Sequence, residues 1–313
     1  MSVFVVGGTG FIGLRLVRRL IAKGQDVVCM DINPIQGVFH DAGDHVKIVR
    51  GDVTQFDEVM DAMAAARPER TVNLSYFLEG GVPPRRAMKL NVLGMDNFFE
   101  ASRLCGARHV VYASSLGVHG TQKHYGERPV TEDDYRHGTG QYAMHKIFNE
   151  WQACDYAERF GMVITGIRPA NVTGPDKVRG SIDHVNCITQ PARGNAITFP
   201  YKDAPWCPIH VEDTAEVFAR ITLSDKPRHA IYNTGGATIT LGGIAAIVRE
   251  FIPDARITFE NETGGADSTG LNYLIDNTRL IEEFGIQYPP FRQRALEIIN
   301  DVRAQQGQPA IPT

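Results

Sequence analysis

Ser2-Val3-Phe4-Val5-Val6-Gly7-Gly8-Thr9-Gly10-Phe11-Ile12-Gly13 is the stretch that decides the fold of this chain. The short apolar run at residues 2–6 is typical of a strand that is buried on both faces. After Gly10 the apolar side chains follow helical spacing, with Ile12, Leu16 and Leu20 on one side. The stretch therefore predicts a strand, a glycine turn and a helix.

The three glycines of the turn are spaced as G-x-x-G-x-x-G. Gly7, Gly10 and Gly13 would remove Cβ atoms where the backbone turns sharply and approaches a pyrophosphate, whose charge is met by free N–H groups at the helix N-terminus. A glycine-rich turn without a ligand is the alternative. Because a strand precedes the turn, a helix follows it and an acidic residue, Asp31, stands in the expected place, the pattern favours a dinucleotide site.

Two acidic residues at strand ends are candidates for the adenosine half of the ligand. Asp31 ends the second apolar run, where its carboxylate can accept both ribose hydroxyls and would repel a 2′-phosphate. This favours NAD over NADP, and a loop-capping acid is the alternative. Asp52 follows the third predicted strand, residues 46–50, and can bind the adenine amino group while Val53 packs on the ring. A capping role explains Asp52 equally well.

The predicted catalytic residues come from a strand end and the helix after it. A fifth strand over residues 109–115 finishes in Ser115, and a long helix is expected from residue 141 to 160. Tyr142 and Lys146, four residues apart, lie one above the other on that helix. The ammonium should lower the pKa of the phenol by favouring phenolate. We expect Ser115 to hydrogen-bond the substrate oxygen, Tyr142 to move its proton and Lys146 to bind ribose hydroxyls. A chance Tyr-x-x-x-Lys spacing is the alternative.

Size and composition exclude several classes of function. A chain of 313 residues predicts two unequal lobes, and a net charge of −4 without basic blocks argues against nucleic acid or an anionic membrane as partner. The five cysteines are scattered and form no C-x-x-C, and the histidines lack metal-ligand spacing, so we expect neither disulfides nor a metal. The absence of a leader or a long apolar stretch leads us to expect a cytoplasmic protein.

These motifs together resemble the extended short-chain dehydrogenase/reductase superfamily, and within it the NAD-dependent epimerase/dehydratase group. The resemblance extends to residues 91–94 (Asn-Val-Leu-Gly), 167–175 (Ile-Arg-Pro-Ala-Asn-Val-Thr-Gly-Pro), 208–213 (Pro-Ile-His-Val-Glu-Asp) and 232–236 (Tyr-Asn-Thr-Gly-Gly). It implies a Rossmann-type doubly wound parallel sheet with a smaller C-terminal α/β substrate lobe. It also implies an NAD-binding domain over residues 1–173, to which residues 208–235 return, a substrate lobe over residues 174–313, and a homodimer through the helices that end near Cys105 and Phe160. The residues implied to line the NAD site are Gly7, Gly10, Phe11, Ile12, Gly13, Asp31, Asp52, Val53, Leu74, Ser75, Asn91, Ala113, Tyr142, Lys146, Pro169 and Val172.

Departures from the family pattern bear on the substrate. Members that act on nucleotide-sugars usually carry an Arg four residues before the His of Ile-His-Val, where this chain has Trp206, and a second Arg is absent from residues 263–267. A diphosphate would be poorly paired there unless Lys177, Arg179 or Lys202 substitutes. Leu116 after Ser115 disfavours a dehydratase. His119, where the family tends to have Tyr, is either an added acid/base or a filler of that place. The expected substrate residues are Ser115, His119, Asn171, His184 and Trp206.

The sequence leaves three functions open. The main hypothesis is an NAD-dependent oxidoreductase that moves a hydride between a secondary alcohol of a small polyol, sugar acid or related substrate and nicotinamide. If the ketone stays bound and takes the hydride back, the same site gives a sugar or nucleotide-sugar 4-epimerase. A non-catalytic dinucleotide sensor is disfavoured, because such a protein has no need of Tyr142 and Lys146 in register.

Overall fold

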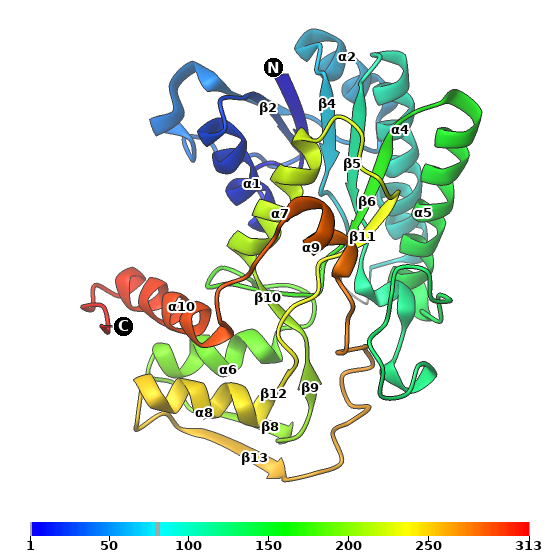
Figure 1. Ribbon diagram of the computed structural model, residues 1–313. Coiled ribbons are helices and arrows are strands. Elements are labelled where there is room, and N and C mark those ends of the chain that lie inside the picture. Colours follow the sequence, from blue (N-terminus) through cyan, green and yellow to red (C-terminus); the bar gives the residue numbers. More distant parts are fainter. Residues whose placement is uncertain (1, 79–81, 313) are drawn as a thin grey trace.

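A seven-stranded parallel sheet forms the upper part of the molecule, with the strand order β11-β6-β5-β4-β1-β2-β3 (Figure 1). The computed structural model describes residues 2–78 and 82–312. The chain reverses direction across the sheet between β1 and β4, so the carboxyl ends of these strands form the crevice where α/β folds bind ligands. The strands of this sheet are β1 (Ser2–Val6), β2 (Asp26–Asp31), β3 (Val46–Arg50), β4 (Arg70–Asn73), β5 (His109–Ala113), β6 (Ile164–Arg168) and β11 (Ile231–Asn233).

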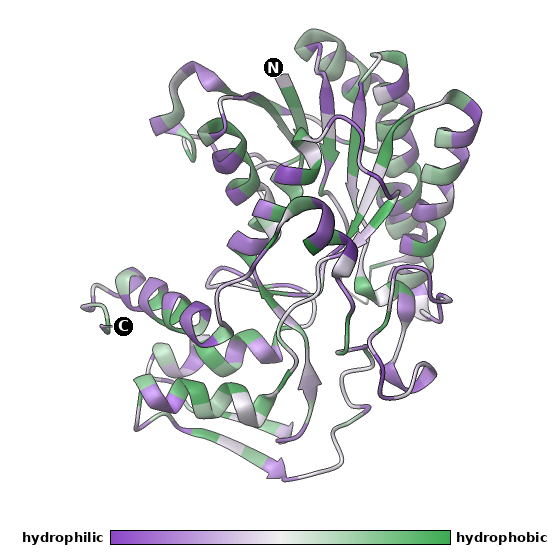
Figure 2. Ribbon diagram, in the orientation of Figure 1, coloured by the Kyte–Doolittle hydropathy of each residue, from purple (hydrophilic) through white to green (hydrophobic). Residues whose placement is uncertain are grey.

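Helices cover both faces of the sheet. On one face Leu16 and Leu20 of α1 pack in the same core as Phe218 of α7. On the other face Met63 of α2 and Phe99 of α4 share a second core with the sheet. Strand β1 lies between the two cores and is hydrophobic along most of its length, as Figure 2 shows. The helices of this part are α1 (Phe11–Ala22), α2 (Phe56–Ala66), α3 (Pro84–Met88), the π-helical turn η2 (Lys89–Leu93), α4 (Gly94–Leu104), α5 (Gly140–Phe160), α7 (Val211–Leu223) and α9 (Thr278–Phe284), with 3₁₀ turns η1 (His40–His45), η3 (Leu116–His119) and η4 (Gln122–His124).

The predicted doubly wound sheet with a smaller C-terminal α/β part is confirmed. The strands end slightly earlier than expected, since residues 74–75 and 114–115 lie beyond β4 and β5. This leaves the residues that follow each strand free to turn toward the crevice.

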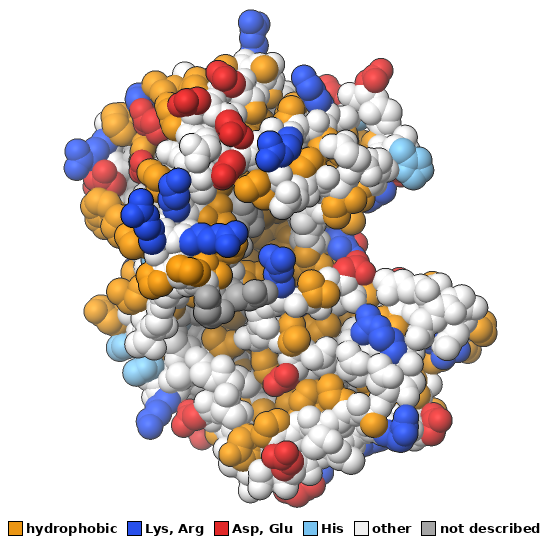
Figure 3. All heavy atoms as spheres, turned by 180° about the vertical axis from the view of Figure 1, so that it is seen from behind, with side chains coloured by type: hydrophobic (Ala, Val, Ile, Leu, Met, Phe, Trp, Pro, Cys, Tyr) orange, Lys and Arg blue, Asp and Glu red, His pale blue; other side chains and the backbone are white. Residues whose placement is uncertain are grey.

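The smaller part lies below the carboxyl ends of the sheet in Figure 1. Its own core joins Ile188, Ile244 and Ile299 from three helices with Phe199 and Ile257 from a two-stranded parallel pair. Viewed from behind, a hollow separates the two parts, and hydrophobic side chains are visible in it (Figure 3). The elements of this part are α6 (Asp183–Ala192), α8 (Leu241–Phe251), α10 (Phe291–Gln305), the pair β8 (Ile197–Tyr201) with β13 (Ile257–Asn261), the pair β9 (Pro205–Trp206) with β12 (Ile239–Thr240), and the pair β7 (Asn171–Thr173) with β10 (Pro208–His210).

Two later segments pack with the large sheet. The segment that contains α7 and β11 packs with it, and Tyr232 of β11 lies opposite Ile167 of β6. Helix α9 also packs there, because Leu280 and the nearby Ile286 are buried in the same core as α1 and α7. The C-terminal half of the chain therefore crosses between the two parts more than once, and α9 lies outside the returning segment expected at residues 208–235.

Candidate functional site

The glycine turn is built for a close approach to the backbone. Gly7 has φ +78°, in the left-handed region that favours glycine. A Cβ on Gly13 would lie 2.1 Å from the Gly7 carbonyl oxygen, so no side chain fits there. Helix α1 begins after Gly10 with no side-chain hydrogen bond at its cap and no acidic residue in its first turn. Its N-terminal N–H groups are therefore available to an anion such as a pyrophosphate.

Asp31 lies beside this turn at the end of β2. Its carboxylate accepts hydrogen bonds from the Thr9 hydroxyl at 2.8 Å and from the Asn33 amide at 3.2 Å. The Gly7 amide donates to the carbonyl of Met30, so the turn and the end of β2 are joined directly. The acid is thus held at the position where ribose hydroxyls are bound in dinucleotide folds. These residues fit NAD.

Asp52 and Val53 lie at the end of the neighbouring strand, β3. The Asp52 carboxylate accepts from the Thr54 amide at 2.9 Å, which is the capping geometry that the sequence left as its alternative. Val53 is 4% exposed, and its carbonyl accepts from the Asn97 side chain. Their expected contact with adenine stays a prediction.

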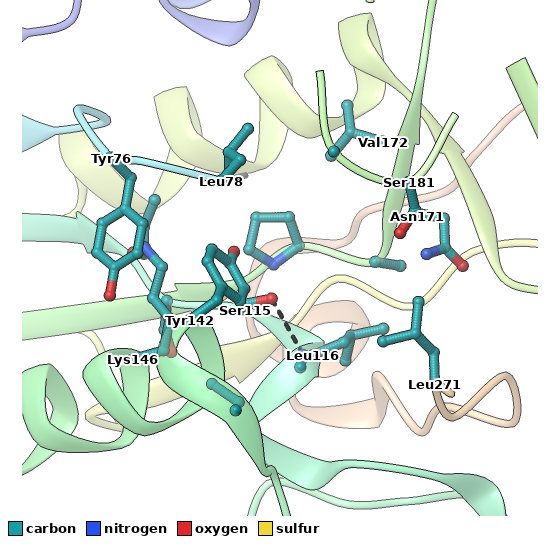
Figure 4. A pocket seen from close by; sticks show the side chains of 18 of the residues that line it. Tyr76, Leu78, Ser115, Leu116, Tyr142, Lys146, Asn171, Val172, Ser181 and Leu271 are labelled. Atoms are coloured by element: carbon teal, nitrogen blue, oxygen red, sulfur yellow. Dashed lines mark hydrogen bonds between the residues drawn. The ribbon is translucent and has the colours of Figure 1, made fainter. Parts of the chain in front are cut away.

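A cavity of about 560 Å³ opens beyond the ends of β1, β4 and β5. Three of the predicted groups meet in it: Ser115, Tyr142 and Lys146 (Figure 4). Asn91 also lines it, although its amide is already paired with both backbone groups of Phe77. The other predicted cofactor or substrate residues in its wall are Phe11, Ile12, Leu74, Ala113, Pro169, Asn171 and Val172. The residues of the adenosine side, Gly7, Gly10, Gly13, Asp31, Asp52, Val53 and Ser75, lie outside this cavity.

Tyr142 and Ser115 face each other across the turn after β5. Burial raises the pKa of the Tyr142 phenol above its ordinary value, and a hydrogen bond with the Ser115 side chain acts in the opposite direction. The Ser115 hydroxyl also accepts from the Gly117 amide at 3.0 Å, which fixes its orientation (Figure 4). The expectation of a net lowering by Lys146 is not met in the protein alone, because burial dominates.

Lys146 is buried and makes two close contacts. Its Nζ donates to the Ala113 carbonyl at 2.5 Å and lies 3.3 Å from the centroid of the Tyr76 ring. The Tyr142 centroid is farther away, at 5.8 Å. Burial lowers the pKa of Lys146 well below its ordinary value, while the negative charge of Glu150 acts to raise it. The aromatic face of Tyr76 adds to the stabilisation of the ammonium.

The expectation that His119 contacts substrate is wrong. The side chain is fully buried, and its Nε2 lies 2.9 Å from the Arg168 guanidinium. Burial, with the positive charge of Arg168, lowers the pKa of His119 to about 3, so the ring is neutral at physiological pH. Arg168 in turn pairs with Glu150 through two 2.8 Å hydrogen bonds. His119 therefore belongs to a buried polar network behind the site, which is the filler role.

A second cavity of about 410 Å³ adjoins the first, since Gly180 and Ser181 line both. Trp206 lies in its wall, as a substrate residue of the smaller part would. His184 does not line either cavity: its ring packs against Trp206 at a centroid distance of 4.5 Å and is fully buried. The expectation of a direct contact between His184 and substrate is therefore wrong, because the indole stands in front of the imidazole.

Two of the three suggested cations lie at the first cavity. Lys177 and Arg179 line it, whereas Lys202 forms an ion pair with Glu262 at 2.7 Å and is absent from both cavity walls. Burial lowers the pKa of Lys177 to about 8, and its Nζ donates to the Val172 carbonyl.

Within residues 2–78 and 82–312 no group of three or more His, Cys, Asp or Glu side chains is arranged to hold a metal, and no helix is long and apolar enough to cross a membrane.

Sequence reasoning missed Tyr76 and Asn272, both of which line the first cavity. Tyr76 carried a signal, since it comes three residues after the end of β4. Asn272 carried none: it lies in an irregular segment far from every motif, and only the fold brings it to the cavity.

Comparison with known proteins agrees with this geometry. The model of the NAD dependent epimerase/dehydratase family matches residues 3–235. A UDP-glucose 4-epimerase of Mycolicibacterium smegmatis is 32% identical over 187 residues, which are 56% of this chain and 57% of that one. Protein CapI of Staphylococcus aureus is 30% identical over 191 residues, 56% of this chain and 55% of that one. The chain thus aligns with little more than half the length of these two relatives.

Longer matches show the same relationship. A UDP-glucose 4-epimerase of Lacticaseibacillus casei is 27% identical over 263 residues, 76% of this chain and 77% of that one. The fold is that of the UDP-glucose 4-epimerase of Thermus thermophilus in complex with NAD, with a TM-score of 0.83, 23% identity, and coverage of 97% of this chain and 99% of the other. A GalE-like L-threonine dehydrogenase from Cupriavidus necator gives a TM-score of 0.81 at 21% identity, with 98% and 100% covered. The chain belongs to the NAD dependent epimerase/dehydratase family, an extended short-chain dehydrogenase/reductase group of enzymes, and its cofactor is NAD.

Proposed function

We propose that this protein is a sugar 4-epimerase that oxidises a secondary alcohol transiently and reduces the ketone again on its other face. The observation that carries the proposal is the convergence of Ser115, Tyr142 and Lys146 on one cavity at the carboxyl ends of the strands. The comparisons favour this reaction over net oxidation of a small polyol or sugar acid, because curated relatives at 32% and 27% identity are UDP-glucose 4-epimerases.

The proton steps belong to this chain's own side chains. Ser115 is held by the Gly117 amide so that its hydroxyl can hydrogen-bond the substrate oxygen. Tyr142, as phenolate, accepts the proton of the alcohol and returns it when the ketone is reduced. NAD, when bound, supplies the acceptor of the hydride and a positive charge. The hydrogen bond with Ser115 opposes the effect of burial on the pKa of Tyr142, and Lys146, whose Nζ lies 5.8 Å from the centroid of the Tyr142 ring, would favour the phenolate when it is charged.

Retention of the ketone requires that the rest of the substrate stay bound while the oxidised ring turns. The second cavity adjoins the first and offers space for that part of the substrate in the smaller lobe. Lys177 and Arg179 are the cations at the cavity wall that would pair with a diphosphate. A nucleotide-sugar is therefore the substrate class we propose.

A net dehydrogenase is the second candidate, favoured by one observation. Trp206, which is 5% exposed, places an apolar side chain in the wall of the second cavity. A charged side chain at this place would hold a diphosphate more directly. A small hydroxylated substrate needs no such charge.

One assay separates the two. NAD-loaded enzyme is given UDP-glucose, UDP-galactose and a panel of free polyols and sugar acids, and both the absorbance of reduced nicotinamide and the isomers formed are followed. We expect interconversion of the two UDP-sugars without net NADH. Accumulation of NADH with a polyol would instead identify a dehydrogenase, and no turnover of either kind would refute both.

We also propose a homodimer through α4 and α5. Met144, Phe148 and Trp151 recur at helical spacing on α5 and are 54%, 42% and 57% exposed, and Leu104 at the end of α4 is 51% exposed. Sedimentation of wild type and of Trp151→Glu tests this: we expect a dimer that the substitution dissociates, and a monomeric wild type would contradict the proposal.

A further inference from the structure

We propose that Asn272 selects the substrate, by forming hydrogen bonds with hydroxyl groups of the sugar through both polar atoms of its carboxamide. The proposal deepens the 4-epimerase function and rests on it. Asn272 is 1% exposed and lies in the wall of the same cavity as Ser115 and Tyr142. Neither Oδ1 nor Nδ2 has a hydrogen-bond partner among the residues that the structure describes. A buried amide with both groups unpaired costs free energy, so a ligand that pairs them gains affinity.

The backbone around Asn272 is held firmly. Gln122, 5% exposed, accepts at Oε1 from the amides of Tyr273 and Leu274 at 3.2 and 3.0 Å. Its own backbone amide donates to the Leu271 carbonyl at 3.4 Å. The Gln122 Nε2 is also occupied, since it donates to the carbonyls of Gly126 and Arg128, both at 2.9 Å. Asn272 is thus fixed between clamped neighbours, which makes its carboxamide a pre-organised group.

The position of the segment around Asn272 suits the binding of sugar hydroxyls that do not react. Figure 4 places Leu271, the residue before Asn272, across the pocket from Tyr76 and Lys146. Trp206 and Thr269 line the second cavity, and the Trp206 indole N–H and the Thr269 hydroxyl also lack partners among the described residues. All three side chains are uncharged.

The chemistry of the carboxamide indicates the ligand group. Oδ1 accepts and Nδ2 donates, so the pair is fully satisfied by a group that offers a donor and an acceptor side by side. Neighbouring sugar hydroxyls do this, whereas a phosphate oxygen only accepts. Recognition by Asn272 therefore concerns the sugar hydroxyls of the substrate, whereas Lys177 and Arg179 of the same cavity wall would pair with the phosphates.

Asn272→Leu tests the proposal, because the proposal predicts that this substitution changes stability and activity in opposite directions. In NAD-loaded, substrate-free enzyme the substitution should raise Tm by about 1–3 °C, because it replaces an unpaired buried amide with an apolar side chain of the same branched shape. It should lower kcat/KM for UDP-galactose about ten- to a hundredfold, since bonds to the substrate are lost, and leave the Kd of NAD unchanged. Gln122→Met is the contrast: its amide is fully paired, so Tm and activity should fall together.

Each other outcome overturns the proposal. A fall in Tm on Asn272→Leu would mean that the amide has a structural partner, and an unchanged kcat/KM would mean that it does not touch substrate. If wild-type enzyme does not turn over UDP-galactose, the proposed function fails, and calorimetry with galactitol decides on Asn272 separately. Equal affinity of wild type and Asn272→Leu for galactitol, or no binding by either, would then refute hydroxyl recognition.

Discussion

The Lys146 ammonium lies 3.3 Å from the centroid of the Tyr76 ring, and that ring meets Tyr142 edge-on at a centroid distance of 5.3 Å. One aromatic side chain therefore contacts both members of the Tyr-x-x-x-Lys pair. Because a cation over a ring face is stabilised, Tyr76 supports the charge that Lys146 needs to favour the Tyr142 phenolate.

Tyr76→Leu should move the acidic limb of the kcat/KM profile to higher pH. Loss of the cation–π contact weakens the positive charge at Lys146, so the pKa of Tyr142 rises, by about 0.5–1 unit for a contact of typical strength. Tyr76→Phe is the matched control, since it keeps the ring and removes a hydroxyl that has no partner among the described residues. A shift of equal size in both variants, or in neither, would contradict this role.

Asp31→Asn should reduce discrimination against NADP by about tenfold or more, because it removes the charge that repels a 2′-phosphate, while its oxygen can keep the hydrogen bond from the Asn33 amide and its NH2 can donate to the Thr9 hydroxyl. Calorimetric Kd values for NAD and NADP measure the effect. Asp52→Asn is the control: any contact of Asp52 with adenine is common to both dinucleotides, so their Kd ratio should not change. An unchanged ratio of the two Kd values in Asp31→Asn would show that the carboxylate does not lie against the ribose hydroxyls.

The sequence predicts what local chemistry determines. The glycine turn, Asp31 and the Ser115, Tyr142 and Lys146 set follow from spacing and from the end of a strand, and the structure brings the last three to one cavity. The sequence could not predict the direction in which a side chain points. His119 was expected in the site because it stands where the family tends to have Tyr, but at the end of the 3₁₀ turn η3 its ring lies against Arg168.

Contacts between separate segments of the chain could not be predicted from the sequence either. The buried pair of Arg168 and Glu150 joins β6 to α5, and the clamp from Gln122 to the segment around Leu274 spans 152 positions. Neither pairing has a periodicity or motif, because each arises only when separate segments of the chain pack against one another.

Glu150→Gln should destabilise the protein at pH 7 by about 3–5 kcal/mol, because it leaves the buried Arg168 without its charged partner. Although burial raises the pKa of Glu150, hydrogen bonds and charge from Arg168 and Arg136 hold it at about 2. The unfolded value is about 4.3, so this stabilisation is complete above that pH and is lost as pH falls toward 2. Urea unfolding from pH 7 to pH 3 measures both effects.

The difference in stability between wild type and Glu150→Gln should therefore shrink on acidification. Asp155→Asn breaks the exposed pair with Arg159 on the same helix and serves as control, with an expected change below about 0.5 kcal/mol. A wild-type advantage that stays constant down to pH 3 would contradict a depressed pKa of Glu150 in the folded protein.

The most direct test of the proposed chemistry is the single-turnover rate of Tyr142→Phe on UDP-galactose with NAD bound. The substitution keeps the ring against Tyr76 and removes only the phenolic oxygen that Ser115 contacts. We predict a fall of about a hundredfold or more, as for the loss of a general base, with an unchanged Kd for NAD. A variant that turns over at the wild-type rate would contradict the assignment of Tyr142 as the group that moves the proton.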